Sequence, residues 1–371
     1  MEPNETYQKY SQLLIDLISS YFTKKKIVLA LEEDDFKWLY LFGKSHKIGA
    51  TLYFALSYND AFKDEKIKKA FEAFYASCLK KTILFEQERA KLYAFCNDNG
   101  IDFLPLKGIN FCTYYPEYGM REFADNDILF DKKCAKKIRN YFLKEGYKIE
   151  TYGNGPHDVY QKAPSLNFEM HRFLFNPEAE FGPISDYFVN ILKTSPIKEN
   201  HEHVMSDEDS YHYFIAHAYK HFSHGGCGVR TLIDIALYLE RFSLKREELD
   251  KALKKSGLYE FEQSISALSL KIYHGGQLTK EETDVFLYIM SSGAYGTIEH
   301  HVANNLKKQS KFGYIMRRLF PPLSYYKNCK PWAYYSIIGI PIAWFIRLMR
   351  AVIHRGKNIK EEIRIVKETD K

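Results

Sequence analysis

The segment that decides the fold is "REFADNDILF", Arg121 to Phe130. Side chains alternate across a β-strand, so Asp125 and Asp127 would face one side of a sheet and Phe130 the other. Two carboxylates side by side on a half-buried strand repel each other. A metal ion or a basic side chain is therefore needed beside them, and Arg121 and Lys133 are the basic candidates near this strand.

A third acid lies on another predicted strand, "LNFEMH" (166–171). Glu169 and His171 face one side of that strand, and Glu169 lies between the apolar residues Phe168 and Met170. Three carboxylates from adjacent strands could hold two divalent cations, because Mg²⁺ prefers carboxylate ligands completed by substrate phosphates. Two such ions stabilise the attacking and the leaving oxygen of an in-line phosphoryl displacement.

The surrounding pattern predicts a compact unit between residues 101 and 172, in the order β-α-β-α-β-β-β. "IDFLPLKG" (101–108) is a strand that runs into a turn at Lys107 and Gly108, followed by a short helix. A glycine there permits close backbone approach to a phosphate, and a helix N-terminus favours an anion. "DKKCAKKIRNYFLKEG" (131–146) is a helix, and "YKIETY", "DVYQKA" and "LNFEMH" are the last three strands.

Helical patterns lie on both sides of this unit. Apolar residues recur at helical spacing from about 64 to 98, and Ser206 with Asp209 has the spacing of a capping box. We therefore expect an α+β fold, in which a small mixed-sheet core is flanked by N-terminal and C-terminal helical regions. The expected divisions are a helical region at 1–99, the α/β core at 100–200, a helical domain at 201–312, and a helical, aromatic segment with a polar tail at 313–371.

The composition is that of a globular protein, with 46% hydrophobic and 27% charged residues. The net charge of +6 is spread over small clusters, which favours solvated surface over a polyanion-binding stripe. Six cysteines without CxxC pairing, after a polar beginning, favour a cytoplasmic protein with free thiols over a zinc ribbon or a disulfide scaffold. They are Cys78, Cys96, Cys112, Cys134, Cys227 and Cys329.

The segment "PWAYYSIIGIPIAWFI" (331–346) has no charge, but it is short for a bilayer span and contains Pro341. Basic residues flank it on both sides. We expect a buried helix pair that packs on the helical domain. The alternative is a weak membrane-surface contact through residues 327–357.

The helix that follows Ser206 carries His217, Lys220 and His221. The two histidines are four residues apart and share one face with apolar residues, a spacing that would suit zinc, although no HExxH glutamate accompanies them. Hydrogen-bonded interior histidines and a cleft position near a nucleotide are the other interpretations. On the next helix, Arg230 and Asp234 have ion-pair spacing, and they could instead face the substrate.

The order of turn, acid pair and third acid resembles the nucleotidyltransferase superfamily related to DNA polymerase β. "LPLKGINFCTYYPEYGMREFADNDILF", "NFEMHRF" and "HAYKHFSHGGCGVRTLIDIALYL" are similar, in this order, to motifs of a family described as uncharacterised nucleotidyltransferases. The similarity runs from about residue 100 to 240, and arguably to the C-terminus. The Gly-Ser turn usual in the superfamily is here Lys107-Gly108-Ile109, which lacks a hydroxyl and adds a positive charge.

The resemblance implies a transfer of a nucleotidyl group from an NTP to a hydroxyl acceptor, with Mg²⁺ or Mn²⁺ and release of pyrophosphate. It implies that Asp125 and Asp127 bind the metals and that Glu169 completes the site and helps to activate the acceptor. It implies that Lys107, Gly108 and Arg121 contact the triphosphate. We also predict nucleotide binding by His171, His217, Lys220 and His221, although His171 could instead pack against Glu169.

The acceptor could be a small hydroxylated molecule, a protein side chain or the 3′ end of an RNA. Two functions of other classes stay open from the sequence. One is a catalytically silent nucleotide-binding or interaction protein of the same fold, and the other is a peripheral membrane protein.

Overall fold

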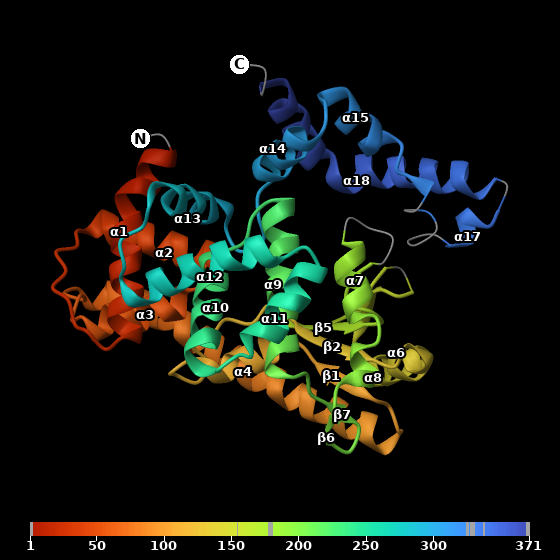
Figure 1. Ribbon diagram of the computed structural model, residues 1–371, viewed down its shortest axis with the longest axis horizontal. Helices are drawn as coiled ribbons and strands as arrows, with labels where there is room; N and C mark the ends of the chain where they lie inside the picture. Colours follow the sequence, from red (N-terminus) through yellow and green to blue (C-terminus); the bar gives the residue numbers. More distant parts are fainter. Residues whose placement is uncertain are drawn as a thin grey trace.

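A seven-stranded mixed sheet lies beside a large helical half in the computed structural model, which describes residues 3–153, 155–176, 181–323, 326, 331–336 and 338–368 (Figure 1). The strand order is β3-β4-β5-β2-β1-β7-β6, with β2 parallel to β5 and β1 parallel to β7. The strands are β1 (Phe103–Pro105), β2 (Asn126–Phe130), β3 (Lys148–Thr151), β4 (His157–Lys162), β5 (Leu166–His171), β6 (Ile197–Glu199) and β7 (Glu202–His203).

The α+β class and the five strands expected from the sequence are confirmed, with two corrections. β2 begins at Asn126, so Asp125 precedes the strand that was expected to contain it. The short strands β6 and β7 extend the sheet beyond β1 and were not expected. The edge strand β6 is exposed at all of its residues, so it lacks the apolar alternation that marks a strand in sequence.

Helices make up most of the chain. The long ones of the N-terminal and central parts are α1 (Pro3–Phe22), α2 (Glu33–His46), α3 (Gly49–Tyr58), α4 (Glu65–Asp98), α6 (Ala135–Lys144), α9 (Asp207–His224), α10 (Val229–Arg241), α11 (Arg246–Lys255), α12 (Tyr259–His274) and α13 (Lys280–Ser292). The short ones are α5 (Gly108–Phe111), α7 (Gly182–Phe188) and α8 (Ile191–Thr194). As expected, Ser206 caps α9 by accepting a hydrogen bond from the backbone N–H of Asp209.

The two faces of the sheet pack on different partners. Ile128 and Phe168 point into a hydrophobic cluster with residues of α4 and α6. Leu104 and Leu129 point the other way, into the larger cluster formed by the helical half. The acidic residues of β2 and β5 share this second face, because side chains alternate along each strand.

Helix α4 takes part in both hydrophobic clusters. Its 34 residues rise by about 50 Å along the bottom of the molecule in Figure 1. Phe71 packs with the helical half, whereas Phe85 and Leu92 pack under the sheet. Arg89 lies between Phe85 and Leu92 on α4 and donates a 2.8 Å hydrogen bond from Nη1 to Oδ1 of buried Asn126. This hydrogen bond fixes the start of β2.

A buried ion pair joins the loop before β2 to α10. Arg121 donates from Nε and Nη2 to the two carboxylate oxygens of Asp234, at 2.9 and 2.8 Å, and Tyr115 donates to the same carboxylate at 2.8 Å. Arg121 and Asp234 are 6% and 2% exposed. The helical spacing suggested an ion pair between Arg230 and Asp234, but Asp234 binds Arg121. Arg230 donates a hydrogen bond to the backbone carbonyl of Glu122.

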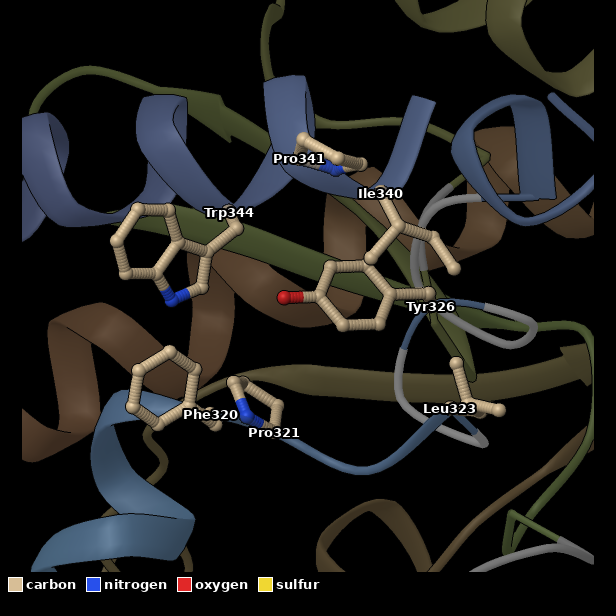
Figure 2. A pocket seen from close by; sticks show the side chains of 7 residues that line it. All are labelled: Phe320, Pro321, Leu323, Tyr326, Ile340, Pro341 and Trp344. Carbon is tan, nitrogen blue, oxygen red and sulfur yellow. The ribbon is translucent and has the colours of Figure 1, made fainter. Parts of the chain in front are cut away.

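The C-terminal helices are α14 (Ile298–Lys308), α15 (Lys311–Leu319), α17 (Pro331–Tyr334) and α18 (Gly339–Glu368), which lie together at one edge of the molecule (Figure 1). The expected buried helix pair is wrong for residues 331–346, because Trp332, Tyr335 and Phe345 are more than half exposed. Phe320 stacks on Trp344 beside an apolar pocket (Figure 2). Lys327 and Cys329 lie outside the described residues, and the five other cysteines are free thiols.

No helix within the described ranges combines the length and the apolar character that crossing a membrane requires.

We predict that stability falls in mild acid because of His46, which joins three helices. Its Nδ1 accepts from the backbone N–H of Val229 at 3.2 Å, and its Nε2 lies 2.9 Å from the carbonyl oxygen of Met290. Burial lowers the pKa of His46 to about 4. The unfolded chain, with an ordinary histidine pKa near 6.5, therefore binds more protons below that pH, so the free energy of unfolding falls by about 2 kcal/mol between pH 7 and pH 5 from this group.

Urea unfolding of the wild type and of His46→Gln at both pH values would measure this. The variant should be less stable at pH 7 but should lose less stability on acidification. His274→Gln, at an exposed histidine on α12, is the matched control. An unchanged pH dependence in His46→Gln would contradict the prediction.

We also predict strong coupling between Arg121 and Asp234. Arg121→Met or Asp234→Leu alone should lower the free energy of unfolding by about 3–5 kcal/mol, since each leaves an uncompensated buried charge. The double variant should cost clearly less than the sum. Removal of the exposed Glu247–Lys251 pair on α11 is the control, with an effect below about 1 kcal/mol. Additive single effects in urea unfolding would count against the coupling.

Candidate functional site

Three carboxyl groups meet on the face of the sheet that points toward α9. Each of Asp125, Asp127 and Glu169 offers an oxygen, and these oxygens all lie within 4.8 Å of one another. Asp127 and Glu169 are directly opposite in the parallel register of β2 and β5, which brings their side chains together. Asp127 is buried, whereas Asp125 and Glu169 are partly open to solvent.

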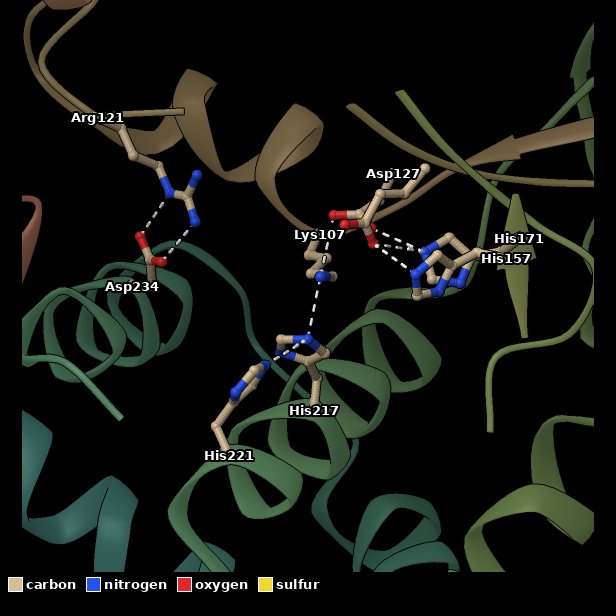
Figure 3. Close-up of polar contacts among 9 residues, drawn as sticks. Lys107, Arg121, Asp127, His157, His171, His217, His221 and Asp234 are labelled. Atoms are coloured by element: carbon tan, nitrogen blue, oxygen red, sulfur yellow. Dashed lines mark hydrogen bonds and ion pairs between the residues drawn. The ribbon is translucent and has the colours of Figure 1, made fainter. Parts of the chain in front are cut away.

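Lys107 is the basic side chain that contacts this group. Its Nζ lies 3.0 Å from Oδ2 of Asp127 (Figure 3). The backbone of Lys107 has φ +21° and ψ −99°, outside the regions that L-residues favour, so the turn after β1 is strained. The backbone N–H of Leu106 donates to the carbonyl oxygen of Asp127 at 3.0 Å, which ties this turn to β2.

Gly108 follows in the same turn and is closely covered by Arg121. A Cβ added at Gly108 would lie 3.1 Å from Nη1 of Arg121. Nη1 of Arg121 thus lies against the turn, while Nε and Nη2 bind Asp234. Figure 3 shows this pair of hydrogen bonds to Asp234. Arg121 thus binds Asp234 and not the three acids of the cluster.

The protonation of the three acids reflects their crowding. Burial alone would raise the pKa of Asp127, but Lys107 and His171 lower it well below its ordinary value. Burial, and then the charge of Asp127, raises the pKa of Asp125 to about 6. Burial, and then Asp127 and Asp125, raises the pKa of Glu169 to about 8. One ammonium group therefore does not compensate three carboxylates, and further positive charge would be needed to ionise them all.

Two histidines border the carboxyl group of Glu169. Nε2 of His171 lies 2.8 Å from Oδ1 of Asp127 and 3.8 Å from Oε2 of Glu169, while Nε2 of His157 lies 3.6 Å from that same oxygen. Burial, and then His171, lowers the pKa of His157 to about 4, so this ring is neutral. His157, Glu169 and His171 form a second group whose ligand atoms lie within 4.8 Å of one another.

His157 was missed in the sequence. It stands at the start of β4, and its place opposite His171 follows from the antiparallel register of β4 and β5. The alternation along β4 indicates which side the ring faces, but only the strand pairing brings it to Glu169.

Helix α9 forms the other wall of the site. Nε2 of His217 lies 3.0 Å from Nζ of Lys107 and 3.1 Å from Nε2 of His221. Burial, and then Lys107, lowers the pKa of both imidazoles, that of His221 to about 3. Neutral His217 can therefore accept a hydrogen bond from Lys107. Within the part of the chain that the structure describes, these two rings join no cluster of three metal-ligand side chains, which leaves the zinc interpretation without support.

Lys220 lies one turn from His217 on α9 and is also partly buried. Burial, and then the charge of Lys107, lowers the pKa of Lys220, while Glu169 and Asp127 act in the opposite direction. The ammonium group is thus close enough to the carboxyl cluster to be influenced by it. Tyr213, buried on the same helix, was not among the candidates from sequence. Burial raises the pKa of its hydroxyl group, while Lys107 lowers that pKa and Asp127 raises it.

Most of the sequence-derived candidates therefore come together in space. The residues gathered at the site are Lys107, Asp125, Asp127, Glu169, His171, His217, Lys220 and His221. Gly108 and Arg121 lie beside them in the turn and the adjoining ion pair. Contacts of these residues with a nucleotide stay predictions.

Comparison with known proteins supports the resemblance seen in the motifs. A family model described as uncharacterised nucleotidyltransferase matches residues 32–273, from the beginning of α2 to the end of α12. The match thus extends well before residue 100 and ends before α13. No curated protein and no solved structure matches the chain. With about two thirds of its length covered, carrying the sheet, the three acids and α9, the chain belongs to the uncharacterised nucleotidyltransferase family.

Proposed function

We propose that the protein transfers a nucleotidyl group from an NTP to a hydroxyl acceptor and releases pyrophosphate, with Mg²⁺ or Mn²⁺. The acceptor oxygen forms a bond to the α-phosphorus, the bond from that phosphorus to the bridging oxygen breaks, and the acceptor proton is lost. The observation that carries the proposal is the meeting of three carboxyl groups with Lys107 on the sheet of a nucleotidyltransferase family member.

The donor set fits a hard divalent cation. Asp125, Asp127 and Glu169 supply oxygen ligands only, which suits Mg²⁺ or Mn²⁺ better than softer metals. Their incomplete neutralisation by Lys107 supports the same assignment, because crowded carboxylates gain from added positive charge. When bound, such ions would neutralise charge on the triphosphate and polarise the phosphoryl oxygens.

The protein's own side chains would position the reactants and balance charge. Lys107 contacts Asp127, and the pKa of Lys220 is influenced by Glu169 and Asp127. Both lysines would bind phosphate oxygens, with Arg121 beside the turn of Gly108. Glu169 is 22% exposed and Asp127 is 2% exposed, so Glu169 is the more accessible of the two. It would receive the proton of the acceptor hydroxyl when added positive charge keeps its carboxyl group ionised. His171, hydrogen-bonded to Asp127, would hold that carboxylate in place.

His217 and His221 would act through Lys107. His217 contacts the ammonium group directly, and His221 contacts His217, so the pair fixes the position of the lysine. Both rings are neutral and add no charge beside a nucleotide.

The acceptor is a small hydroxylated molecule, a protein side chain or an RNA 3′ end. The first 310 residues, which contain the site, carry 40 Lys and Arg against 43 Asp and Glu. This acidic balance disfavours a long nucleic acid, whose binding depends on cationic contacts with phosphates.

Metal-dependent binding of an NTP is the first prediction of this proposal. Asp125→Asn should weaken the binding of NTP with Mn²⁺ by more than about tenfold. Mutation of a residue that only hydrogen-bonds to a metal ligand already lowers metal affinity by about 10–100-fold, and Asp125 would be a ligand itself. Asp125 is the preferred variant because the Lys107–Asp127 contact stays intact. The measurement is calorimetry with each NTP, with and without metal, together with release of pyrophosphate.

Asp98→Asn, which changes an exposed acid at the end of α4, is the matched control and should bind like the wild type. If neither metal nor NTP binds the wild type, the proposal fails. If NTP binds but no pyrophosphate appears with any acceptor class, a silent nucleotide-binding protein becomes the better description.

A second prediction separates phosphate binding from metal binding. Lys220→Met should reduce the affinity for NTP by roughly tenfold, about 1.4 kcal/mol, because one charge-assisted contact is lost. The affinity for Mn²⁺ alone should stay the same or rise, since a nearby cation is removed. Lys193→Met, on α8, is the control. Equal loss of Mn²⁺ and NTP binding in calorimetry would argue against a phosphate contact by Lys220.

A further inference from the structure

The net positive charge is concentrated at the C-terminal end of the chain, which corrects the expectation that it is spread over small clusters. Residues 311–371 carry 13 Lys and Arg and 4 Asp and Glu, a net charge of +9, whereas the whole chain carries +6. The remaining 310 residues are therefore net −3. This basic segment lies beyond residue 273, where the family match ends.

Helix α15 exposes an apolar stripe. Phe312, Ile315, Met316 and Leu319 recur at the spacing of one helical face, and their exposed fractions lie between 37% and 74%. The opposite side of α15 is fixed on α18, where Tyr314 and Arg318 both bind the carboxylate of Glu362. The apolar stripe therefore points away from α18, whose Glu362 these two side chains bind.

Helix α18 exposes a second, longer stripe. Its members follow helical spacing over four turns, with exposed fractions from 40% to 66%. They are Ile338, just before the helix, and Ile342, Phe345, Ile346, Met349 and Ile353. The opposite side of the same helix carries buried Ala343 and the half-buried Trp344, which pack with Tyr326.

Basic side chains lie on the same face of α18, C-terminal to the second stripe. Lys360 and Lys367 follow Ile353 at intervals of seven residues and are exposed, and exposed Arg350 borders the stripe. Along this one face of α18, the N-terminal half carries exposed apolar side chains and the C-terminal half carries exposed lysines. That distribution is typical of helices that lie in a membrane interface and contact anionic head groups.

Aromatic residues and an apolar cavity complete this surface. Trp332 and Tyr335 are 54% and 77% exposed in and just after α17, and aromatic rings of this kind favour the level of the head groups. An open cavity of about 310 Å³ lies between the end of α15 and the start of α18, and Figure 2 shows Phe320, Leu323 and Ile340 around it. Every residue that lines it is apolar or aromatic, so it suits hydrocarbon.

We propose that α15 and α18 dock the protein on an anionic lipid surface, with the two stripes in the interface and the basic side chains at the head groups. The charge favours this occupant over a second copy of the chain, which would bring one segment of +9 against another. It favours lipid over nucleic acid as well, because phosphates alone would leave the apolar stripes in water. The proposal goes beyond nucleotidyl transfer and does not depend on it.

The test is co-sedimentation of the full chain with vesicles of phosphatidylcholine alone or with 30% phosphatidylserine. The wild type should sediment with the anionic vesicles, and added salt should weaken this binding. Arg350→Gln, Lys360→Gln and Lys367→Gln together should weaken it roughly 100-fold, at about 1 kcal/mol for each charge. Ile342→Gln, Phe345→Gln and Met349→Gln together should abolish it.

A matched control makes the same change at exposed apolar residues elsewhere. Val28→Gln, Leu41→Gln and Val189→Gln together should leave sedimentation unchanged, as should Asp125→Asn. Equal partition of the wild type into neutral and anionic vesicles would overturn the proposal, as would an effect of the control equal to that of the α18 variants. Absence of vesicle binding would also overturn it; ultracentrifugation would then show whether the stripes instead join two copies.

Discussion

The contact between Lys107 and Asp127 is the interaction on which the site depends. Asp127 sits on a buried strand beside two other carboxyl groups, a position in which an uncompensated charge would be costly. A strained backbone at Lys107 brings its ammonium group to that carboxylate. Only one of the three acids is compensated in this way, so further positive charge beside Asp125 and Glu169 would be favourable.

The helical half of the molecule holds this arrangement from the other side. His217 on α9 contacts Lys107, and Asp234 on α10 binds Arg121 beside the turn of Gly108. The two helices therefore reach the turn and the loop that precede the acidic strand. Sheet and helices form one site, which explains why the family match includes both.

Much of the site could be predicted from the sequence because alternation along short strands is a local property. The side to which Asp127 and Glu169 point follows from their own neighbours, and so does the cap at Ser206. Partners from distant segments could not be predicted in this way. Arg121 binds Asp234 across 113 residues, in place of the local pair that helical spacing suggested, and His157 reaches Glu169 only through strand pairing. The C-terminal helices show a further limit of prediction from sequence, since an apolar stripe has the same spacing whether it is buried or exposed.

The long helix α4 limits where the chain can be divided. One half of α4 completes the helical cluster and the other half completes the cluster under the sheet, with Arg89 holding Asn126 between the acids. A gene fragment that begins at the first strand would encode the acids without the wall behind them. A fragment that keeps the packing around the acids therefore has to include α4, because cutting within that helix would separate the two hydrophobic clusters that it joins.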